Sequence, residues 1–159
     1  MSRAPDWRSP EINAPVQMTF RRATLNDCAL LAELNHQLIH DEGHRNPMTV
    51  PELEQRMTGW LTSEYAAMLF ENDSKVVAYA LYCEQPAEIY LRQLFVVQDQ
   101  RRKGLGRQAM EILRSKIWPK HKRLTVGVLI QNEAAVSFWR SVGYKDYSLT
   151  LEILPGAVS

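Results

Sequence analysis

Leu94-Phe95-Val96-Val97 is followed, after Gln98-Asp99-Gln100, by the basic run Arg101-Arg102-Lys103-Gly104-Leu105-Gly106-Arg107. The apolar run predicts a strand, and the basic run predicts a glycine-containing turn that leads into a helix. Backbone N–H groups and the positive end of a helix dipole would then point at one spot. Glycine lets an anion approach the backbone, and the Arg and Lys side chains add full charges. The stretch therefore predicts a turn that binds a pyrophosphate.

The spacing of the glycines excludes two familiar nucleotide sites. The run lacks the GxGxxG pattern of dinucleotide-binding folds and the GK[ST] ending of a P-loop. Lys103 precedes Gly104, but no Ser or Thr follows to hold magnesium. These departures argue against nucleoside triphosphate chemistry.

Composition describes an ordinary globular chain. The 159 residues are 45% hydrophobic and 23% charged, with a net charge of +1, which suits one domain and gives no reason to expect nucleic acid or membrane partners. Cys28 and Cys83 belong to no CxxC or Cys/His pattern, so we expect buried free thiols in a reducing compartment. There is no run of membrane-spanning length and no signal-peptide core, and we expect a cytoplasmic protein.

The chain alternates strand and helix patterns. Residues 1–15 carry Pro5, Pro10 and Pro15 and predict an extension that is partly disordered. Thr24 and Asp27 form a capping box that opens the first helix. In order, the expected elements are a strand at 16–22, helices at 24–43 and from 50, strands at 65–70, 75–84 and 88–97, a helix at 104–118, a strand at 124–130, a helix at 132–143, and one or two strands at 144–154. This order predicts a mixed α/β (α+β) class with one central sheet.

Two blocks of sequence resemble a known family. The first is Leu94-x-Val96 followed by Arg101-x-x-Gly104-x-Gly106, and the second is Asn132-x-x-Ala135-x-x-Phe138-Trp139-x-x-x-Gly143-Tyr144. Both resemble motifs of the GNAT superfamily of N-acetyltransferases. The resemblance implies one domain over residues 16–154, with a short tail at 155–159. It also implies a mostly antiparallel sheet of six to seven strands, splayed between the fourth and fifth, and about four helices.

The resemblance further implies where acetyl-CoA binds. The pantetheine arm would pair with the backbone of Leu94 and Val96 as an added strand does. The pyrophosphate would lie on the N–H groups of residues 102–107, and Asn132 would meet the thioester end, with Ala135 and Phe138 packing beside it. Arg101 is either structural or reaches a phosphate. The implied cofactor-binding set is Leu94, Phe95, Val96, Arg101, Arg102, Lys103, Gly104, Leu105, Gly106, Arg107, Asn132, Ala135 and Phe138.

The implied reaction is direct transfer from the thioester to a primary amine of a small molecule. Many family members place a Tyr directly after the motif Phe, where its hydroxyl protonates the departing thiolate. Trp139 occupies that position here and has no acidic hydroxyl. Tyr144, Tyr147 and Tyr90 are the alternative acids, and water is another.

Arg92 is a second departure. Polyamine acetyltransferases, which resemble the chain near this point, carry a Glu where Arg92 stands. We therefore expect Arg92 to hold a carboxylate or phosphate on the acceptor. The alternative is a structural arginine paired with a nearby acid such as Glu84 or Glu88.

The end of the first helix supplies further candidates. In the resembled family this region borders the acceptor pocket, so Asp41 and Glu42 would attract the amine or accept its proton, directly or through water. The alternative is that they are solvated carboxylates. His36 and His40 share a helical face, but HQLIH lacks the Glu of HExxH, and we expect no metal.

Other functions remain open from the sequence alone. One is a CoA-binding sensor that has lost catalysis, and another is a protein or peptide N-acetyltransferase. Edge strands in the C-terminal half could also support a homodimer.

Overall fold

The computed structural model describes residues 18–43 and 45–157. The expected extension at residues 1–15 and the start of the first expected strand lie outside them. Contacts divide the chain after Gly127 into two compact units, each described by itself. The elements of the first unit are β1 (Thr19–Arg22), η1 (Leu25–Asp27), α2 (Cys28–Asp41), α3 (Val50–Leu61), β2 (Tyr65–Asn72), β3 (Lys75–Glu84), β4 (Glu88–Val96), η2 (Gln98–Gln100), α4 (Leu105–Ile112), η3 (Leu113–Ile117) and β5 (Arg123–Val126).

One five-stranded sheet forms the centre of the first unit, in the order β1-β2-β3-β4-β5. The first four strands are antiparallel neighbours, whereas β4 and β5 are parallel. Asp73 and Ser74, with φ of 52° and 64°, join β2 to β3. Two successive residues of positive φ are typical of a type I′ turn, whose twist matches that of a hairpin. The expected hairpin and mixed sheet are confirmed.

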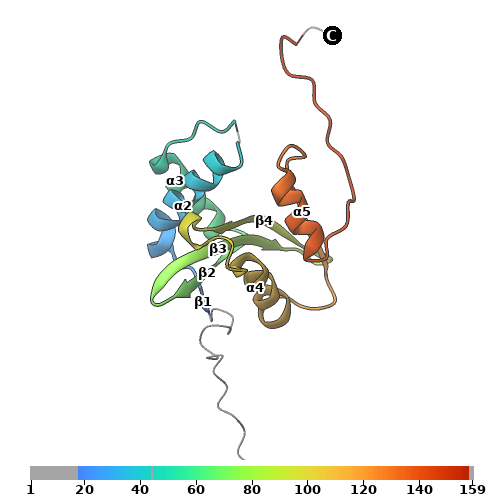
Figure 1. Cartoon of the computed structure of the whole chain (residues 1–159). Coiled ribbons are helices and arrows are strands. Elements are labelled where there is room, and N and C mark those ends of the chain that lie inside the picture. The colour runs from blue at the N-terminus through green and yellow to red at the C-terminus, as the bar shows by residue number, and fades with distance from the viewer. Residues whose placement is uncertain (1–17, 44, 158–159) are drawn as a thin grey trace, which may run out of the picture. The chain divides into compact units, whose positions relative to one another are not determined.

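The helices of the first unit lie on both faces of the sheet. Leu31 and Leu34 of α2 and Met57 of α3 pack with Leu69 and Tyr79 in one buried cluster. Because side chains alternate across a strand, Tyr82 points to the other face. Its ring meets Trp118, just beyond α4 and η3, at 5.4 Å. Figure 1 shows α2 and α3 together on one side of the sheet and α4 on the other.

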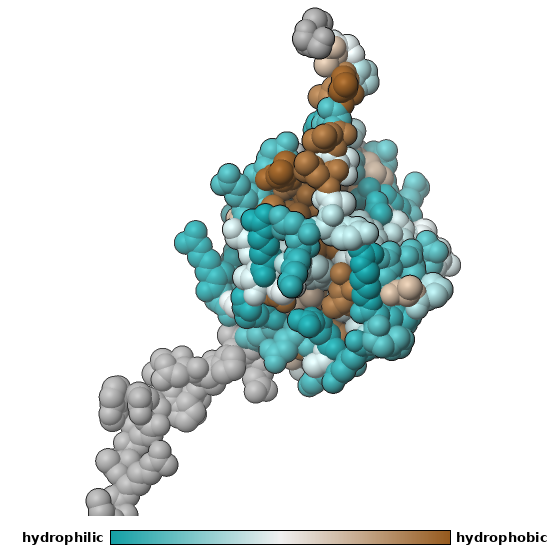
Figure 2. All heavy atoms as spheres, turned by 90° about the vertical axis from the view of Figure 1, so that its right-hand side faces the viewer, coloured by the Kyte–Doolittle hydropathy of each residue, from teal (hydrophilic) through white to brown (hydrophobic). Residues whose placement is uncertain are grey.

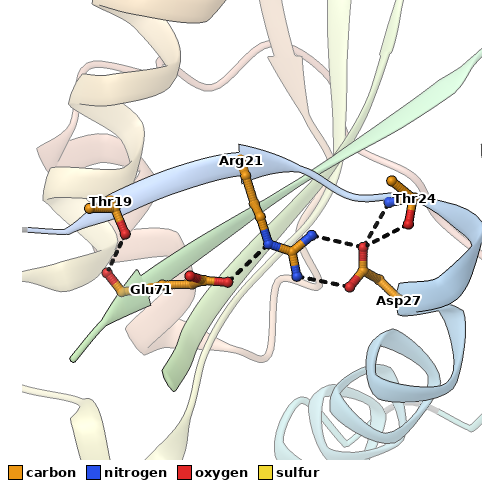
Figure 3. A network of polar contacts seen from close by, with 5 residues as sticks. All are labelled: Thr19, Arg21, Thr24, Asp27 and Glu71. Atoms are coloured by element: carbon orange, nitrogen blue, oxygen red, sulfur yellow. Dashed lines mark hydrogen bonds and ion pairs between the residues drawn. The ribbon is translucent and has the colours of Figure 1, made fainter. Parts of the chain in front are cut away.

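A charged network fixes the start of α2. Arg21 donates to both carboxylate oxygens of Asp27 at 2.9 Å and, through Nε, to Glu71 at 3.0 Å. The Asp27 carboxylate also accepts from the backbone N–H of Thr24 at 2.7 Å, which completes the expected capping box (Figure 3). The Arg21 guanidinium, followed by the Thr24 bonds, holds the pKa of Asp27 below its usual value.

Three expectations about the elements are corrected. The expected strand at 124–130 ends at Val126, and the expected helix at 104–118 passes from α4 into the π-helical turn η3. The backbone N–H of Trp118 donates to the carbonyl of Leu113 at 2.7 Å, a five-residue step that ends the helix before Pro119. Residues 144–157 contain no strand, so the described residues hold five strands rather than six or seven.

The second unit contains α5 (Glu133–Ser141) and the C-terminal segment. Tyr147, Leu149, Leu151 and Ile153 alternate along that segment and are exposed. Figure 2 shows apolar atoms gathered on it. The alternation suggested a strand, but a strand also needs a paired neighbour, and none joins this segment among the described residues.

Two smaller expectations concern cysteines and membranes. Cys28 and Cys83 are buried free thiols, as predicted. Within the described ranges, none of the helices combines the length and apolar character that crossing a bilayer requires.

Candidate functional site

β4 separates from β5 at Arg92. The parallel pairing of the two strands runs from Glu88 opposite Arg123 to Leu91 opposite Val126, where it ends. On the other side of β4, Leu81 faces Gln93 while Tyr82 faces Leu91, so Arg92 is the extra residue of a β-bulge. A bulge bends its strand and re-aims side chains, and this one comes directly after the last residue of β4 that pairs with β5.

Because β5 ends at Val126, the rest of β4 has no neighbouring strand on that edge among the described residues. Beyond Leu91, the described residues place no strand beside β4 on the β5 side. The N–H of Val97 donates to the carbonyl of Val77 on β3 at 2.9 Å. Because these groups alternate along a strand, the N–H and C=O of Val96 point to the opposite, open side. By the same alternation, Leu94 also faces the open side. The edge carries the residues expected to bind pantetheine.

The basic turn follows this edge directly. Arg102 and Gly104 both have positive φ, 64° and 75°, which turns the chain sharply before α4 begins at Leu105. Gly104 is the N-cap residue, and no side chain of the described residues caps α4. Orphan N–H groups of a first helical turn favour anions. Lys103 reaches Gln100 at 3.2 Å, and the side chain of Leu105 is buried.

Arg101 ties the turn to the end of α2. Its Nε donates to the carbonyl of Val96 at 2.8 Å, and its Nη2 lies 2.6 Å from Oδ2 of Asp41. The guanidinium also lies 5.2 Å from the ring of Phe95, which is buried in the core. Of the two expected functions of Arg101, these contacts support the structural one. They also bring Asp41, an expected acceptor-site residue, into contact with the basic turn.

A chain of side-chain hydrogen bonds joins β3 and α2 to Gln93, the residue that follows the bulge. Tyr79 of β3 donates to Gln93 at 2.8 Å, and Gln93 donates to Oδ1 of Asn35 on α2 at 3.1 Å. Burial, with the negative charge of Glu42 as the next contribution, raises the pKa of Tyr79. The sequence analysis missed this chain. An Asn within an apolar helical stripe was the only available signal.

Arg92 lies against aromatic side chains of α3 and β2. Its guanidinium lies 4.8 Å from the ring centre of Trp60, and its Nη1 donates to the hydroxyl of Tyr65 at 3.3 Å. Arg56, one helical turn before Trp60, lies 4.5 Å from the same ring centre. Trp60 is half-buried: it packs against the core cluster below α2 and α3, and its ring also contacts both arginines. Sequence reasoning missed Arg56, because an arginine on a helix is typical of a solvated face.

Glu84 and Glu88, the suggested partners of a structural Arg92, form ion pairs with other residues. Lys122 lies 2.7 Å from Glu84, and Arg123 lies 2.8 Å from Glu88. These pairs hold β5 beside β3 and β4. Among the described residues, Arg92 therefore forms neither of the two ion pairs that its structural alternative named.

In the second unit, α5 begins at the second motif. Oδ1 of Asn132 accepts from the N–H of Ala135 at 3.1 Å and caps the helix. The rings of Phe138 and Trp139 lie 5.0 Å apart, and those of Trp139 and Tyr144 lie 5.4 Å apart. The ring of Trp139 therefore contacts both the motif Phe and the candidate acid Tyr144.

Comparison with known proteins decides the family. A family profile described as "Acetyltransferase (GNAT) domain" matches residues 30–152. The chain belongs to the GNAT acetyltransferases. No curated protein sequence matches this GNAT domain.

Solved structures share the fold of this GNAT domain. A mutant of the BH1408 protein from Bacillus halodurans has a TM-score of 0.72 and 22% identity, with 86% of this chain and 98% of that chain covered. An aminoglycoside N-acetyltransferase in complex with CoA has a TM-score of 0.69 and 12% identity, with 89% and 96% covered. A predicted acetyltransferase with acetyl-CoA from Clostridium acetobutylicum has a TM-score of 0.67 and 15% identity, with 87% and 96% covered.

His36 and His40 of this GNAT domain lie side by side, with ring centres 4.6 Å apart. Across the described ranges, no three His, Cys, Asp or Glu side chains form a group that could hold a metal ion.

Proposed function

We propose that this GNAT domain transfers an acetyl group from acetyl-CoA to a primary amine of a small molecule, with both substrates bound together. One observation carries the proposal: the open edge at Leu94 and Val96 leads directly into the basic turn and the uncapped start of α4. An edge that can pair with an extended amide chain, followed by an anion-binding turn, matches a pantetheine arm joined to a pyrophosphate. The CoA and acetyl-CoA complexes among the similar structures support this choice of donor.

Backbone N–H groups and basic side chains would both contribute to binding acetyl-CoA. The N–H of Val96 would bind the pantetheine or polarise the thioester carbonyl, because its own carbonyl is already taken by Arg101. The N–H groups of α4's first turn, with Arg102, Lys103 and Arg107, would hold the pyrophosphate. Asn132, Ala135 and Phe138 would meet the thioester end.

The reaction moves one proton off the amine and one onto sulfur. The amine nitrogen forms a bond to the thioester carbonyl carbon while the carbon–sulfur bond breaks. We assign Asp41 to position Arg101, with which it forms an ion pair, and Glu42 to deprotonate the amine through water. Tyr144 would supply the proton to the thiolate in place of the Tyr that Trp139 replaces.

The experiment measures thiol release from acetyl-CoA over a panel of small amines and short peptides, with CoA binding measured separately by calorimetry. The proposal expects CoA binding and thiol release that depends on a small amine. CoA binding without turnover on any acceptor would favour the sensor function. Turnover on peptides alone would favour the peptide acetyltransferase.

A further inference from the structure

We propose that Arg56 and Arg92 bind an anionic group, a carboxylate or a phosphate, on the amine acceptor. This inference rests on the proposed function and names the substrate class of the same site. Both guanidinium groups lie against the indole ring of Trp60, at 4.5 Å and 4.8 Å from its centre. Together with Tyr65, these residues define what we call the arginine pair site.

The arginine pair site holds an uncompensated positive charge. Within residues 18–43 and 45–157, neither Arg56 nor Arg92 forms an ion pair with a carboxylate. By contrast, Arg21, Arg101 and Arg123 each have a carboxylate partner. An aromatic ring attracts a cation but does not neutralise its charge. The two arginines therefore lie close together with their repulsion unrelieved.

Arg56 shows the consequences of this arrangement. Its Nε is buried and has no hydrogen-bond partner among the described residues. Burial, followed by the positive charge of Arg92, lowers the pKa of Arg56. A buried donor without an acceptor destabilises the fold, and an anion at this point would satisfy the donor and offset the repulsion.

The position of Arg92 connects the site to the proposed chemistry. Arg92 is the bulged residue at which β4 leaves β5, and Leu94, the start of the open edge, lies two residues further along the strand. Two strand residues span about 7 Å. An anionic group at Arg92 and an amine at the open edge would therefore lie a few bonds apart, as in a small amino acid or an aminoalkyl phosphate.

The same charge distribution disfavours polycationic acceptors. A second cation on the acceptor would approach two arginines that lack carboxylate partners, and like charges repel. We therefore expect this domain to differ in its acceptor from the aminoglycoside N-acetyltransferase that shares its fold.

The test compares matched amines that differ only in charge. The pairs are β-alanine with β-alaninamide, and aminoethyl phosphate with ethanolamine, and a polycationic aminoglycoside is added. We expect the anionic member of at least one pair to be preferred, and the pair that shows the preference distinguishes carboxylate from phosphate. In Arg92→Gln and Arg56→Gln, KM for that acceptor should rise about 10- to 100-fold, while KM for acetyl-CoA stays unchanged.

Further variants separate charge from packing. Arg92→Lys keeps the charge but loses the planar fork and should be intermediate. Arg92→Glu should shift the preference to the member of each pair that lacks the anionic group. Lys75→Gln, which removes an exposed cation at the β2/β3 turn, is the matched control and should match the wild type.

A binding measurement completes the test if no panel amine is a substrate. Acetate and inorganic phosphate should change the fluorescence of Trp60 in the wild type but not in the Arg56→Gln/Arg92→Gln double variant, and Trp60→Phe assigns the signal. Equal responses in both proteins, or equal use of both members of each amine pair, would overturn this inference alone. Failure to bind CoA would instead count against the proposed function.

Discussion

Oδ2 of Asp41 lies 2.6 Å from Nη2 of Arg101 and joins the last residue of α2 to the first residue of the basic turn. The same guanidinium donates to the carbonyl of Val96. One arginine thus fixes both the end of the open edge and the helix that precedes the proposed base, Glu42.

Asp41 and Glu42 should therefore differ in their kinetic signatures. We expect Asp41→Asn to raise KM for acetyl-CoA about tenfold, because the charge-assisted bond that positions Arg101 is weakened. We expect Glu42→Gln to lower kcat about 100-fold with little change in KM, as loss of a general base does. Steady-state kinetics in both substrates measures the split. Full activity of the Asp41→Asn/Glu42→Gln double variant would remove both residues from the mechanism.

Gly104→Ala should destabilise the fold and weaken acetyl-CoA binding. Gly104 has φ of 75°, and a left-handed conformation costs an alanine about 1–2 kcal/mol. Space is not the obstacle, because an added Cβ would meet nothing within 4 Å. Chemical denaturation and calorimetry with CoA measure the two effects.

Gly59→Ala is the matched control for this prediction. Gly59 lies within α3, and its Cβ would also meet nothing within 4 Å. Alanine in a helix interior should stabilise the fold by about 0.5–1 kcal/mol and leave CoA binding unchanged. Equal effects of the two substitutions would contradict the assigned importance of the backbone conformation at Gly104.

The charge of Asp27 should make the free energy of unfolding depend on pH in the acid range. The bonds from Arg21 and then Thr24 lower the pKa of Asp27 in the folded state. Its stabilisation is therefore present above the unfolded value, about 3.9, and is lost as pH falls through the lower folded value. We expect Asp27→Asn to lower the free energy of unfolding by about 1 kcal/mol at neutral pH.

The difference in the free energy of unfolding between the wild type and Asp27→Asn should vanish in strong acid. Urea denaturation across the acid range measures it, and Glu54→Gln on the exposed face of α3 serves as the control. A deficit in Asp27→Asn that persists undiminished at the acid limit would show that its carboxylate charge is not the cause.

Tyr144 should contribute to kcat. Because Tyr144 is the proposed acid, Tyr144→Phe should lower kcat about tenfold while both KM values stay near those of the wild type. Tyr147→Phe removes the hydroxyl of a nearby exposed tyrosine and should have no effect. Wild-type rates in both variants would contradict the assignment of Tyr144 and leave Tyr90 or solvent as the proton donor.

The local patterns predicted most of the fold. The capping box of Thr24 and Asp27, the turn between β2 and β3, and the helix capped by Asn132 all depend on neighbours in the sequence. Such features are set by local backbone chemistry and are visible in one chain. The order of strands and helices followed from them.

The errors arose where distant residues decide the outcome. The alternating side chains from Tyr147 to Ile153 satisfy the pattern of a strand, but pairing requires a partner edge that the pattern does not specify. Arg56 was missed for the same reason, because only tertiary packing brings it to the ring that Arg92 also contacts. The bulge that places Arg92 is likewise a property of two paired strands.

Hydrogen exchange at Leu94 and Val96, followed by NMR with and without acetyl-CoA, tests the central claim most directly. The account places the donor along the open edge of β4, so addition of acetyl-CoA should slow exchange of both amides and of the first-turn amides of α4. The amide of Val97, already bonded to Val77, provides an internal reference. Unchanged exchange at Leu94 and Val96 under saturating acetyl-CoA would contradict the account.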